Sequence, residues 1–578
     1  MSYKQSTKGK KRLQSETGTF VRRGAHDLSI ALVYPNTYPV AMSNLGFQLV
    51  YRLFNEIDGV VCERAFLPDR EDLGSYEEGK TPIATLETGR ILIDCDIVAF
   101  SVPFENDFPN IVKILGLSGI PIYSSQREDD MPLVAAGGVT AFLNPEPVAD
   151  FIDCFIIGEG EAVLPAFVKS FINNRADGKS AALDVLGSLP GIYIPKNYDV
   201  KYSPQGEVAS YTAKDGVPKN VRRVWLSAEE LEKSRGGSGI TAKDTEFGDM
   251  SLIEVGRGCG RGCRFCAAGF IYLPPRERKP EALNSEFDEA ISAGKRIGLI
   301  SPSLADHPDI EGICRHISEN GGSTSISSVR ADRLDEGYLD YIKDGGQKTV
   351  TIAPEAGTER LRSVINKGLS DEAILGAIST IAEAAIPNIR LYFMIGLPSE
   401  RDEDIQGIIE TAIRCRDRFI DESRVHGTVG RITLSINSFV PKPFTPFQWH
   451  PMEDVKSLKS KLQQIIKRLR REANIEVICD APKLTHIQGL LSRGDRRVGS
   501  IIAAVSRNGG NWKSATKDTG IDPGFYTTRE RSKDELFPWE VIDIGLDKDY
   551  LWKEYQRGLE GKFTPPCHIG PCTRCGVC

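Results

Sequence analysis

Short apolar runs alternate with amphipathic helical patterns along most of this 578-residue chain, and this alternation is the strongest constraint on its fold. Strand-length runs separated by helical patterns are typical of parallel sheets rather than of sandwiches or helix bundles. Between residues 250 and 450 the strand-like runs are SLIEVGR, KRIGLIS, STSISSVR, KTVTIAPEAG, NIRLYFMIGLP and GRITLSINSFVP. These units predict a partial (β/α)6 barrel, whose functional residues lie at the carboxyl ends of its strands.

A second alternating series precedes the barrel, with the runs DLSIALVYP, DIVAFSVPF, PLVAAGG and FIDCFIIGEGE. It predicts an α/β, Rossmann-like domain over residues 28–210, after a partly flexible lead of residues 1–27. A polar linker over residues 211–249 leads to the barrel at residues 250–450. We expect residues 451–578 to form a smaller α+β domain that begins with an amphipathic surface helix and ends in a cysteine-rich metal site.

The composition excludes several classes of protein. A formal net charge of −7 provides no overall attraction to nucleic acid or to an anionic membrane surface. No apolar run reaches the length of a membrane span, and the polar first residues lack the apolar centre of a secretory signal, so we expect a cytoplasmic protein. Seven of the thirteen cysteines lie in two tight clusters, which in a large chain of this kind favours metal thiolates over disulfides.

The first cluster lies in GRGCGRGCRFCAAGF at residues 256–270, where Cys259, Cys263 and Cys266 form a CxxxCxxC pattern after the first barrel strand. Thiolates are soft ligands that suit iron–sulfur clusters and zinc. Three of them on one loop hold three corners of a cubane and leave one iron free to bind a substrate or cofactor. The alternatives are three unconnected thiols or a zinc site completed from a distance, since structural zinc normally has four protein ligands.

With the aromatic Phe265 before its third cysteine, this pattern resembles the radical S-adenosylmethionine (radical SAM) superfamily. The resemblance implies a four-iron four-sulfur cluster whose free iron binds the amino and carboxylate groups of S-adenosylmethionine. Reduction then cleaves the sulfonium to methionine and a 5′-deoxyadenosyl radical. Similarity in later segments implies further S-adenosylmethionine contacts from Ser301, Arg330, Glu355 and Gly396. Polar residues at strand ends also cap helices, so a structural role is the alternative for each.

The N-terminal domain indicates which branch of the superfamily this chain resembles. The segments SVPF, AAGGVTAFLNPEP and IIGEGE resemble the cobalamin-binding domain that precedes the radical domain in one branch of this superfamily. A glycine pair where a strand turns lets a planar or nucleotide-like ligand approach the backbone closely. The positions that the resemblance assigns to cobalamin are Ser101, Gly137, Gly138, Thr140, Gly158 and Glu159. A nucleotide-binding domain with tight turns is the alternative.

Residues 28–210 contain no histidine, so the DxHxxG motif that ligates cobalt in methionine-synthase-like proteins is missing. The sequence therefore predicts cobalamin with its own base displaced and with no histidine of this domain on the cobalt. A weakly ligated cobalt favours transfer of its upper methyl group.

The second cysteine cluster is CHIGPCTRCGVC, with Cys567, Cys572, Cys575 and Cys578 in a Cx4CxxCxxC pattern that can wrap one metal centre. This close spacing of the cysteines is more typical of ferredoxin-type iron–sulfur binding than of zinc, which more often uses two pairs of ligands with a longer stretch between them. We therefore favour an auxiliary iron–sulfur cluster, with zinc as the alternative and His568 as a further candidate ligand.

The segments FVPKPFTPFQW, LLSRGDRRVG and FPWEVIDIG extend the resemblance to one subfamily of cobalamin-binding radical proteins. It implies a methyltransferase that transfers a methyl group to an unactivated carbon and needs an external electron donor. We expect the substrate to be an amino-acid residue of a protein or peptide, one such case being the α-carbon of a glutamine in methyl-coenzyme M reductase. The alternatives are a rearrangement, cyclisation or RNA modification without net methyl transfer, and a non-catalytic cobalamin or iron–sulfur sensor.

Overall fold

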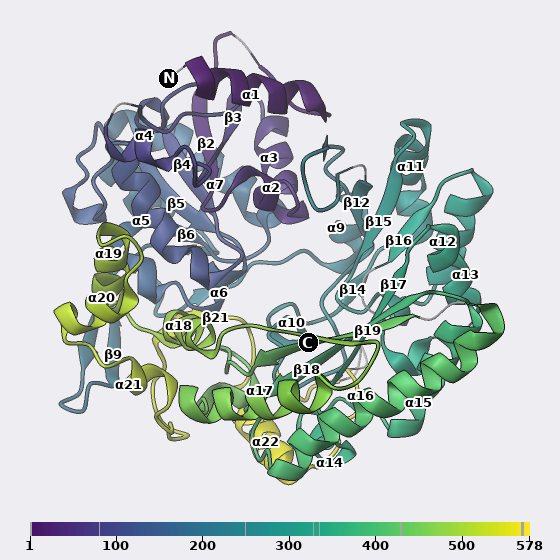
Figure 1. Cartoon of the computed structure of the whole chain (residues 1–578). Coiled ribbons are helices and arrows are strands. Elements are labelled where there is room, and N and C mark those ends of the chain that lie inside the picture. Colours follow the sequence, from purple (N-terminus) through teal and green to yellow (C-terminus); the bar gives the residue numbers. More distant parts are fainter. Residues whose placement is uncertain are drawn as a thin grey trace.

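The computed structural model describes residues 3–22, 24–79, 81–248, 250–326, 329–334, 336–427, 430–567 and 572–578. An N-terminal α/β unit and a β/α barrel lie side by side, and C-terminal helices pack against both (Figure 1).

The N-terminal sheet has the strand order β3-β2-β4-β5-β6-β7, in which β7 pairs antiparallel and the other described strands are parallel. If the parallel strands β2 to β6 are counted as first to fifth along the chain, their order in the sheet is 2-1-3-4-5, which is the flavodoxin-like doubly wound arrangement. The direction in which successive strands are added to the sheet reverses between the neighbours β2 and β4. Ligands of such sheets bind outside the carboxyl ends of the strands. The strands are β2 (Leu28–Tyr34), β3 (Val60–Phe66), β4 (Ile97–Ser101), β5 (Leu133–Gly137), β6 (Cys154–Ile156) and β7 (Ile192–Tyr193).

Helices cover both faces of this sheet, so every residue of β2 is buried. Ile30 lies in the core beneath α3 (Leu45–Glu56) and α7 (Gly160–Asn174). Val33 lies in the core on the opposite face, with α5 (Phe108–Leu117). This two-sided burial is why DLSIALVYP has a continuous rather than an alternating apolar pattern.

The barrel consists of two parallel sheets in succession, joined by a bridge between Val329 and Ile352. Its connecting helices lie on the outer side of the strands (Figure 1). The six predicted strands are all present, and the strand set is β12 (Met250–Glu254), β15 (Arg296–Ile300), β16 (Thr324–Ile326), β17 (Thr349–Glu355), β18 (Asn388–Ile395), β19 (Arg431–Ser438) and β20 (Ile475–Cys479). The outer helices include α11 (Pro280–Ser292), α12 (Ile310–Glu319), α13 (Glu336–Asp344), α15 (Asp371–Glu383) and α16 (Asp402–Ser423).

The barrel continues past the predicted boundary at residue 450. The amphipathic helix expected to open the C-terminal domain is α17 (Val455–Leu469), and its buried residues Leu458 and Ile465 belong to the barrel core. β20 then pairs in parallel with β19. The pattern identifies the helix correctly, but the apolar face of α17 packs on the barrel and adds another β/α unit.

The described residues of the lead and the linker include secondary structure that pairs the two segments, and the flexibility expected for the lead stays a prediction. Tyr3–Ser15 form α1, and β1 (Glu16–Thr17) pairs antiparallel with β11 (Thr241–Ala242) of the linker. Glu16 and Arg64 form an ion pair at 2.7 Å in which both side chains are fully buried. Arg64 also pairs with buried Glu87 at 2.7 Å, so Glu16 supplies a second carboxylate to the same guanidinium and connects the lead to the N-terminal sheet.

Residues after β20 form a mainly helical segment rather than the predicted α+β domain. Ile501 of this segment shares a hydrophobic core with Val33 and Phe100 of the N-terminal sheet, so the segment packs as an extension of that unit. No described helix is both long and apolar enough to cross a membrane. The helices are α18 (Pro482–Arg493), α19 (Val498–Arg507), α20 (Trp512–Thr519), α21 (Pro523–Thr527) and α22 (Lys548–Leu559), and β21 (Ile542–Asp543) pairs with β10 (Val221–Arg222).

Candidate functional site

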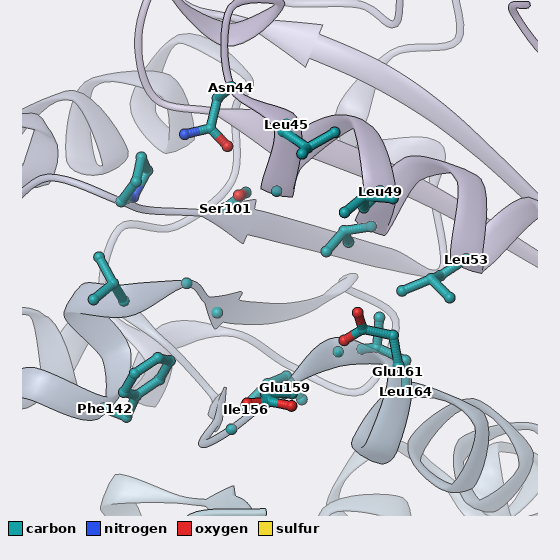
Figure 2. Close-up of a pocket in the computed structure, with 18 of the residues that line it drawn as sticks. Asn44, Leu45, Leu49, Leu53, Ser101, Phe142, Ile156, Glu159, Glu161 and Leu164 are labelled. Carbon is teal, nitrogen blue, oxygen red and sulfur yellow. The ribbon is translucent and has the colours of Figure 1, made fainter. Parts of the chain in front are cut away.

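A cavity of about 570 Å³ lies between the N-terminal sheet and the first part of the barrel. Figure 2 shows Ser101 at the end of β4 together with Leu45, Leu49 and Leu53 of α3 around this space. On the barrel side the lining includes Gly256, Arg257, Gly258, Ser301 and Pro302. The cavity thus occupies the carboxyl ends of the parallel strands, where doubly wound sheets bind their ligands.

The lining combines an apolar slot with a polar mouth. The slot lies between the sheet and helices α3 and α7, and its side chains include Leu49, Leu53, Ile156, Leu164 and Phe167. The mouth lies at the strand and helix ends, and its polar side chains include Asn44, Ser101, Glu159, Glu161 and Arg257. A mostly apolar pocket with a few placed polar groups is typical of a cofactor site.

Most of the positions that the sequence assigns to cobalamin line this cavity, namely Ser101, Gly137, Gly138, Gly158 and Glu159. Thr140 lies outside the lining. Its buried hydroxyl donates a hydrogen bond to the carbonyl of Val102 at 2.6 Å. Thr140 therefore ties the turn after β5 to the end of β4.

Two of these glycines are required by the backbone. Gly138 has φ +102°, and a Cβ there would lie 2.8 Å from the carbonyl oxygen of Val102. Gly158 has φ +139°, and its Cβ would lie 2.1 Å from the carbonyl oxygen of Val224. Their missing side chains also leave the strand ends open toward the cavity.

An ion-pair cluster joins the two units at the mouth of the cavity. Arg257 contacts Glu159 at 2.9 Å, Glu161 at 2.8 Å and Glu254 at 2.7 Å. Glu159 also pairs with Arg276 at 2.6 Å. Burial opposes ionisation of Glu161, but the guanidinium of Arg257 holds its pKa below the usual value. Sequence reasoning misses Arg257 and Glu161, although the opposite charges of GEGE and GRGC are a signal that points to them.

The CxxxCxxC cysteines lie on the loop between β13 (Gly256–Arg257) and α10 (Ala268–Ile271), and each thiol is partly buried. Burial raises the pKa of Cys263 and raises the pKa of Cys266 to about 12, and the neighbouring thiol of Cys259 adds to both shifts. The loop therefore gathers the three thiols in a setting that disfavours bare thiolates. A bound metal centre offsets this penalty because it stabilises the deprotonated sulfur.

The candidate S-adenosylmethionine contacts lie at the ends of successive strands. Ser301 follows β15 and lines the cavity. Arg330 pairs with Asp332 at 2.9 Å, and Glu355 with Lys367 at 3.4 Å. Glu355 has φ +69°, a left-handed conformation that non-glycine residues seldom adopt and that often marks functional sites.

Gly396 and Phe265 lie outside the described cavity lining. Gly396 follows β18, and its N–H donates a hydrogen bond to Glu400 at 2.9 Å. Phe265 packs against the hydrophobic core that the N-terminal sheet shares with the C-terminal helices. Their contacts with S-adenosylmethionine stay predictions.

The C-terminal cysteines also lie close to one another. Burial raises the pKa of Cys567 to about 11, and the thiols of Cys572, Cys575 and Cys578 contribute to this shift. Hydrogen bonds from the backbone and side chain of Arg574 lower the pKa of Cys572. His568, the further candidate ligand, lies outside the described residues.

Among the described residues, no group of three or more His, Cys, Asp or Glu side chains is gathered as it would be around one metal ion. A mononuclear zinc site requires such convergence. An iron–sulfur cluster separates its cysteine ligands further, because they bind different irons of the cluster.

The fold and the site define a class of protein: a doubly wound α/β domain whose cavity extends to the residues directly before Cys259 in a partial β/α barrel. Residues 46–195 match the family of N-terminal domains of radical SAM proteins, and residues 253–412 match the radical SAM superfamily. The chain is therefore a radical SAM superfamily protein, which implies a four-iron four-sulfur cluster and S-adenosylmethionine.

The chain is also similar to individual proteins. An uncharacterized protein of Methanocaldococcus jannaschii is 29% identical over 476 residues, covering 82% of this chain and 90% of the relative. The ribosomal protein uS12 methylthiotransferase RimO of Thermoanaerobacter sp. is 23% identical over 242 residues, covering 39% of this chain and 51% of the relative. The solved structure of the cobalamin-dependent S-adenosylmethionine radical enzyme OxsB with aqua-cobalamin bound has a TM-score of 0.42 at 17% identity, covering 66% of this chain and 52% of that one. The chain thus spans about half the length of the last two.

Proposed function

We propose that this protein is a cobalamin-dependent radical SAM methyltransferase that methylates an unactivated carbon of an amino-acid residue in a protein or peptide. The position of the cavity carries the proposal. The cavity reaches from Ser101 and Gly137 at the strand ends to Gly256–Gly258, the backbone directly before Cys259. A ligand of the N-terminal sheet therefore lies next to the three-cysteine loop, as transfer between two cofactors requires.

The lining residues fit cobalamin. Gly137 and Gly138 present bare backbone at the strand ends, and the slot between α3 and α7 suits the displaced nucleotide base. The described lining contains no histidine. When bound, cobalamin supplies the methyl group, and S-adenosylmethionine on the cluster supplies the radical that activates the substrate.

Residues of the barrel side would orient S-adenosylmethionine and exclude water. The hydroxyl of Ser301 is available at the cavity wall, and the Glu355–Lys367 pair offers a carboxylate for ribose hydroxyls. Tyr272 also lines the cavity and packs edge-on against Phe142, with ring centroids 5.7 Å apart. Burial raises the pKa of Tyr272 to about 12, so it remains a neutral hydroxyl at neutral pH. Aromatic side chains such as these help to exclude water from a radical reaction.

A protein or peptide substrate suits the inner face of the barrel. Along β18 and β19, buried residues face the helices, and the alternate positions Tyr392, Thr433 and Ser435 are only partly buried. Polar side chains there can bind amide groups of a peptide. The net charge of −7 makes RNA, a polyanion, the less suitable substrate. Relatives of this chain are named for methylthio transfer to a ribosomal protein and to tRNA, so their names favour neither substrate.

The proposal is tested with anaerobically reconstituted protein, cobalamin, S-adenosylmethionine, a reductant as the external electron donor, and a panel of peptides. The panel includes one that spans the glutamine of methyl-coenzyme M reductase. We expect S-adenosylhomocysteine and 5′-deoxyadenosine together with a peptide heavier by one CH2. A gain of CH2S would indicate methylthio transfer instead. 5′-Deoxyadenosine with rearranged or cyclised peptide and no methyl gain would refute methyl transfer.

Cysteine variants provide the matched controls. Replacing Cys259, Cys263 and Cys266 by alanine should abolish 5′-deoxyadenosine formation, since no cluster can then reduce S-adenosylmethionine. Cys479→Ala, on β20, should leave it unchanged. Persistent cleavage in the triple variant would contradict the assignment of the loop.

A further inference from the structure

The C-terminal tail, residues 564–567 and 572–578, lies directly on the three-cysteine loop. The backbone N–H of Cys567 donates a hydrogen bond to the carbonyl of Gly260 at 2.7 Å. A Cβ on Gly260 would lie 3.3 Å from the carbonyl oxygen of Cys567, so the two backbones are in close contact. Gly260, which lies within the CxxxCxxC pattern, thus contacts Cys567, the first cysteine of the Cx4CxxCxxC pattern.

Asn366 forms a latch between the loop and the tail. Its side-chain amide donates to the carbonyls of Gly262 at 3.1 Å and Thr564 at 3.1 Å. Its side-chain oxygen accepts the N–H of Thr564 at 2.9 Å. The residue is buried and has φ +56°, so the fold holds an unfavourable backbone conformation to make these bonds.

Arg264, which lies between two of the loop cysteines, extends the contact. Its guanidinium is fully buried and donates to the carbonyl of Lys562 at 2.7 Å and to the hydroxyl of Thr564 at 3.0 Å. It also pairs with Glu554 of α22 at 3.2 Å. The loop therefore cannot move as a unit without disturbing the start of the tail.

The tail is folded back on itself at its cysteines. Arg574 donates to the carbonyl of Pro566 at 3.0 Å and to Sγ of Cys572 at 3.4 Å. The carbonyl of Cys575 accepts the N–H of Asp547 at 2.9 Å. These bonds return the end of the chain to the vicinity of Cys567.

We infer that the tail, when it binds a metal, restrains the three-cysteine loop. We call this arrangement the clamp. A thiolate metal centre held by Cys567, Cys572, Cys575 and Cys578 connects the two described parts of the tail and thereby fixes Cys567 against Gly260. Metal binding and docking are then thermodynamically linked, so loss of the tail metal loosens residues 259–266, and loss of docking weakens the tail metal. The inference requires the two cysteine groups and is independent of methyl transfer.

The first experiment asks whether the tail binds a metal by itself. In the full-length Cys259→Ala/Cys263→Ala/Cys266→Ala variant, the radical cluster is absent. This variant is reconstituted anaerobically with iron and sulfide, or separately with zinc, and metal and sulfide per chain are measured. Iron with sulfide identifies a cluster and zinc alone identifies a zinc site, and either supports the clamp. No retained metal in both arms would overturn it.

The second experiment measures the coupling by hydrogen–deuterium exchange of peptides that contain residues 259–266. The variant Cys572→Ser/Cys578→Ser removes two tail ligands and keeps the buried Cys575, and Cys479→Ser is the matched control. We expect exchange in the loop to rise about tenfold in the tail variant, a loss of about 1.4 kcal/mol, and to stay unchanged in the control. Unchanged loop exchange in a tail variant that has lost its metal would overturn the clamp.

The latch provides an independent test that keeps all cysteines. Asn366→Ala removes the hydrogen bonds to Gly262 and Thr564. We expect this variant to raise exchange in the loop and to release the tail metal to a chelator about tenfold faster than Cys479→Ser does. Wild-type behaviour in both measurements would show that docking and metal binding are uncoupled.

Discussion

Replacing Arg257 by glutamine should weaken the contact between the two units by about 3 kcal/mol. The Arg257 side chain is 10% exposed, and its partners Glu159, Glu161 and Glu254 are 3%, 14% and 15% exposed. Removing one partner of a buried ion pair costs about 3–5 kcal/mol, because a charge stays buried without its counter-ion. The residual exposure of these carboxylates places the cost at the lower end of that range.

Most of this cost should fall on Glu161. In the variant, Glu159 keeps Arg276 at 2.6 Å and Glu254 keeps Arg278 at 3.5 Å. Among the described residues, Arg257 is the cation that pairs with Glu161. The double variant Arg257→Gln/Glu161→Gln removes the orphaned charge, so it should recover about 2 kcal/mol relative to the single variant.

The pH dependence supplies a second signature. Arg257 holds the pKa of Glu161 below its usual value, so the pair contributes stability above the unfolded pKa, and the contribution is lost as the pH falls through the folded pKa. Without Arg257, burial raises the pKa of Glu161. The deficit of the single variant should therefore be largest near about pH 7 and shrink toward about pH 5, as the orphaned carboxylate takes up a proton.

Urea unfolding followed by tryptophan fluorescence measures these differences from the shift in midpoint. Two results would refute the reasoning. One is a double variant as unstable as the single variant, and the other is a deficit that does not change with pH.

Further predictions concern the cavity, the lead and the turn after β5. Leu53→Trp fills the slot and should weaken cobalamin binding at least about 100-fold, or about 2.7 kcal/mol, with an unchanged circular dichroism spectrum; retention of the visible cobalamin absorbance after desalting would contradict the placement of the cofactor. Glu16→Gln leaves buried Arg64 with Glu87 as its remaining carboxylate and should lower the free energy of unfolding by about 1.5–3 kcal/mol, as for loss of a hydrogen bond to a charged group. An unchanged midpoint in thermal unfolding would mean that this contact of the lead contributes nothing. Gly138→Ala should lower the free energy of unfolding by about 1–3 kcal/mol, because Gly138 has φ +102° and its Cβ would lie 2.8 Å from a carbonyl oxygen. Gly137→Ala is the control, since its Cβ would make an ordinary contact at 3.5 Å. Equal stability of the two variants would contradict the backbone argument.

The elements of both α/β units follow from local pattern. The run DLSIALVYP predicts β2, and the helical spacing of DVKSLKSKLQQIIKRL predicts α17, because side-chain periodicity is set within a few residues. The local pattern does not predict which part of the chain packs against an apolar face. The pattern of α17 is equally compatible with a separate domain and with the barrel, and the packing of Leu458 and Ile465 in the barrel core decides between them.

The sequence by itself determined the chemistry of the sites. Three soft ligands in a CxxxCxxC pattern and four in a Cx4CxxCxxC pattern predict thiolate metal binding, since the spacing alone brings these sulfurs onto single loops. The absence of histidine from residues 28–210 is likewise a fact of the sequence.

Only the tertiary structure decided how these sites are connected. Arg257 pairs with Glu161 across 96 residues of sequence, and Cys567 meets Gly260 across a still longer separation. Charged residues and backbone amides occur throughout the chain, so nothing local marks which of them will meet. Their contacts depend on how the N-terminal sheet, the barrel and the tail pack together, and that packing is set by apolar surfaces distant in sequence from the groups that it brings together.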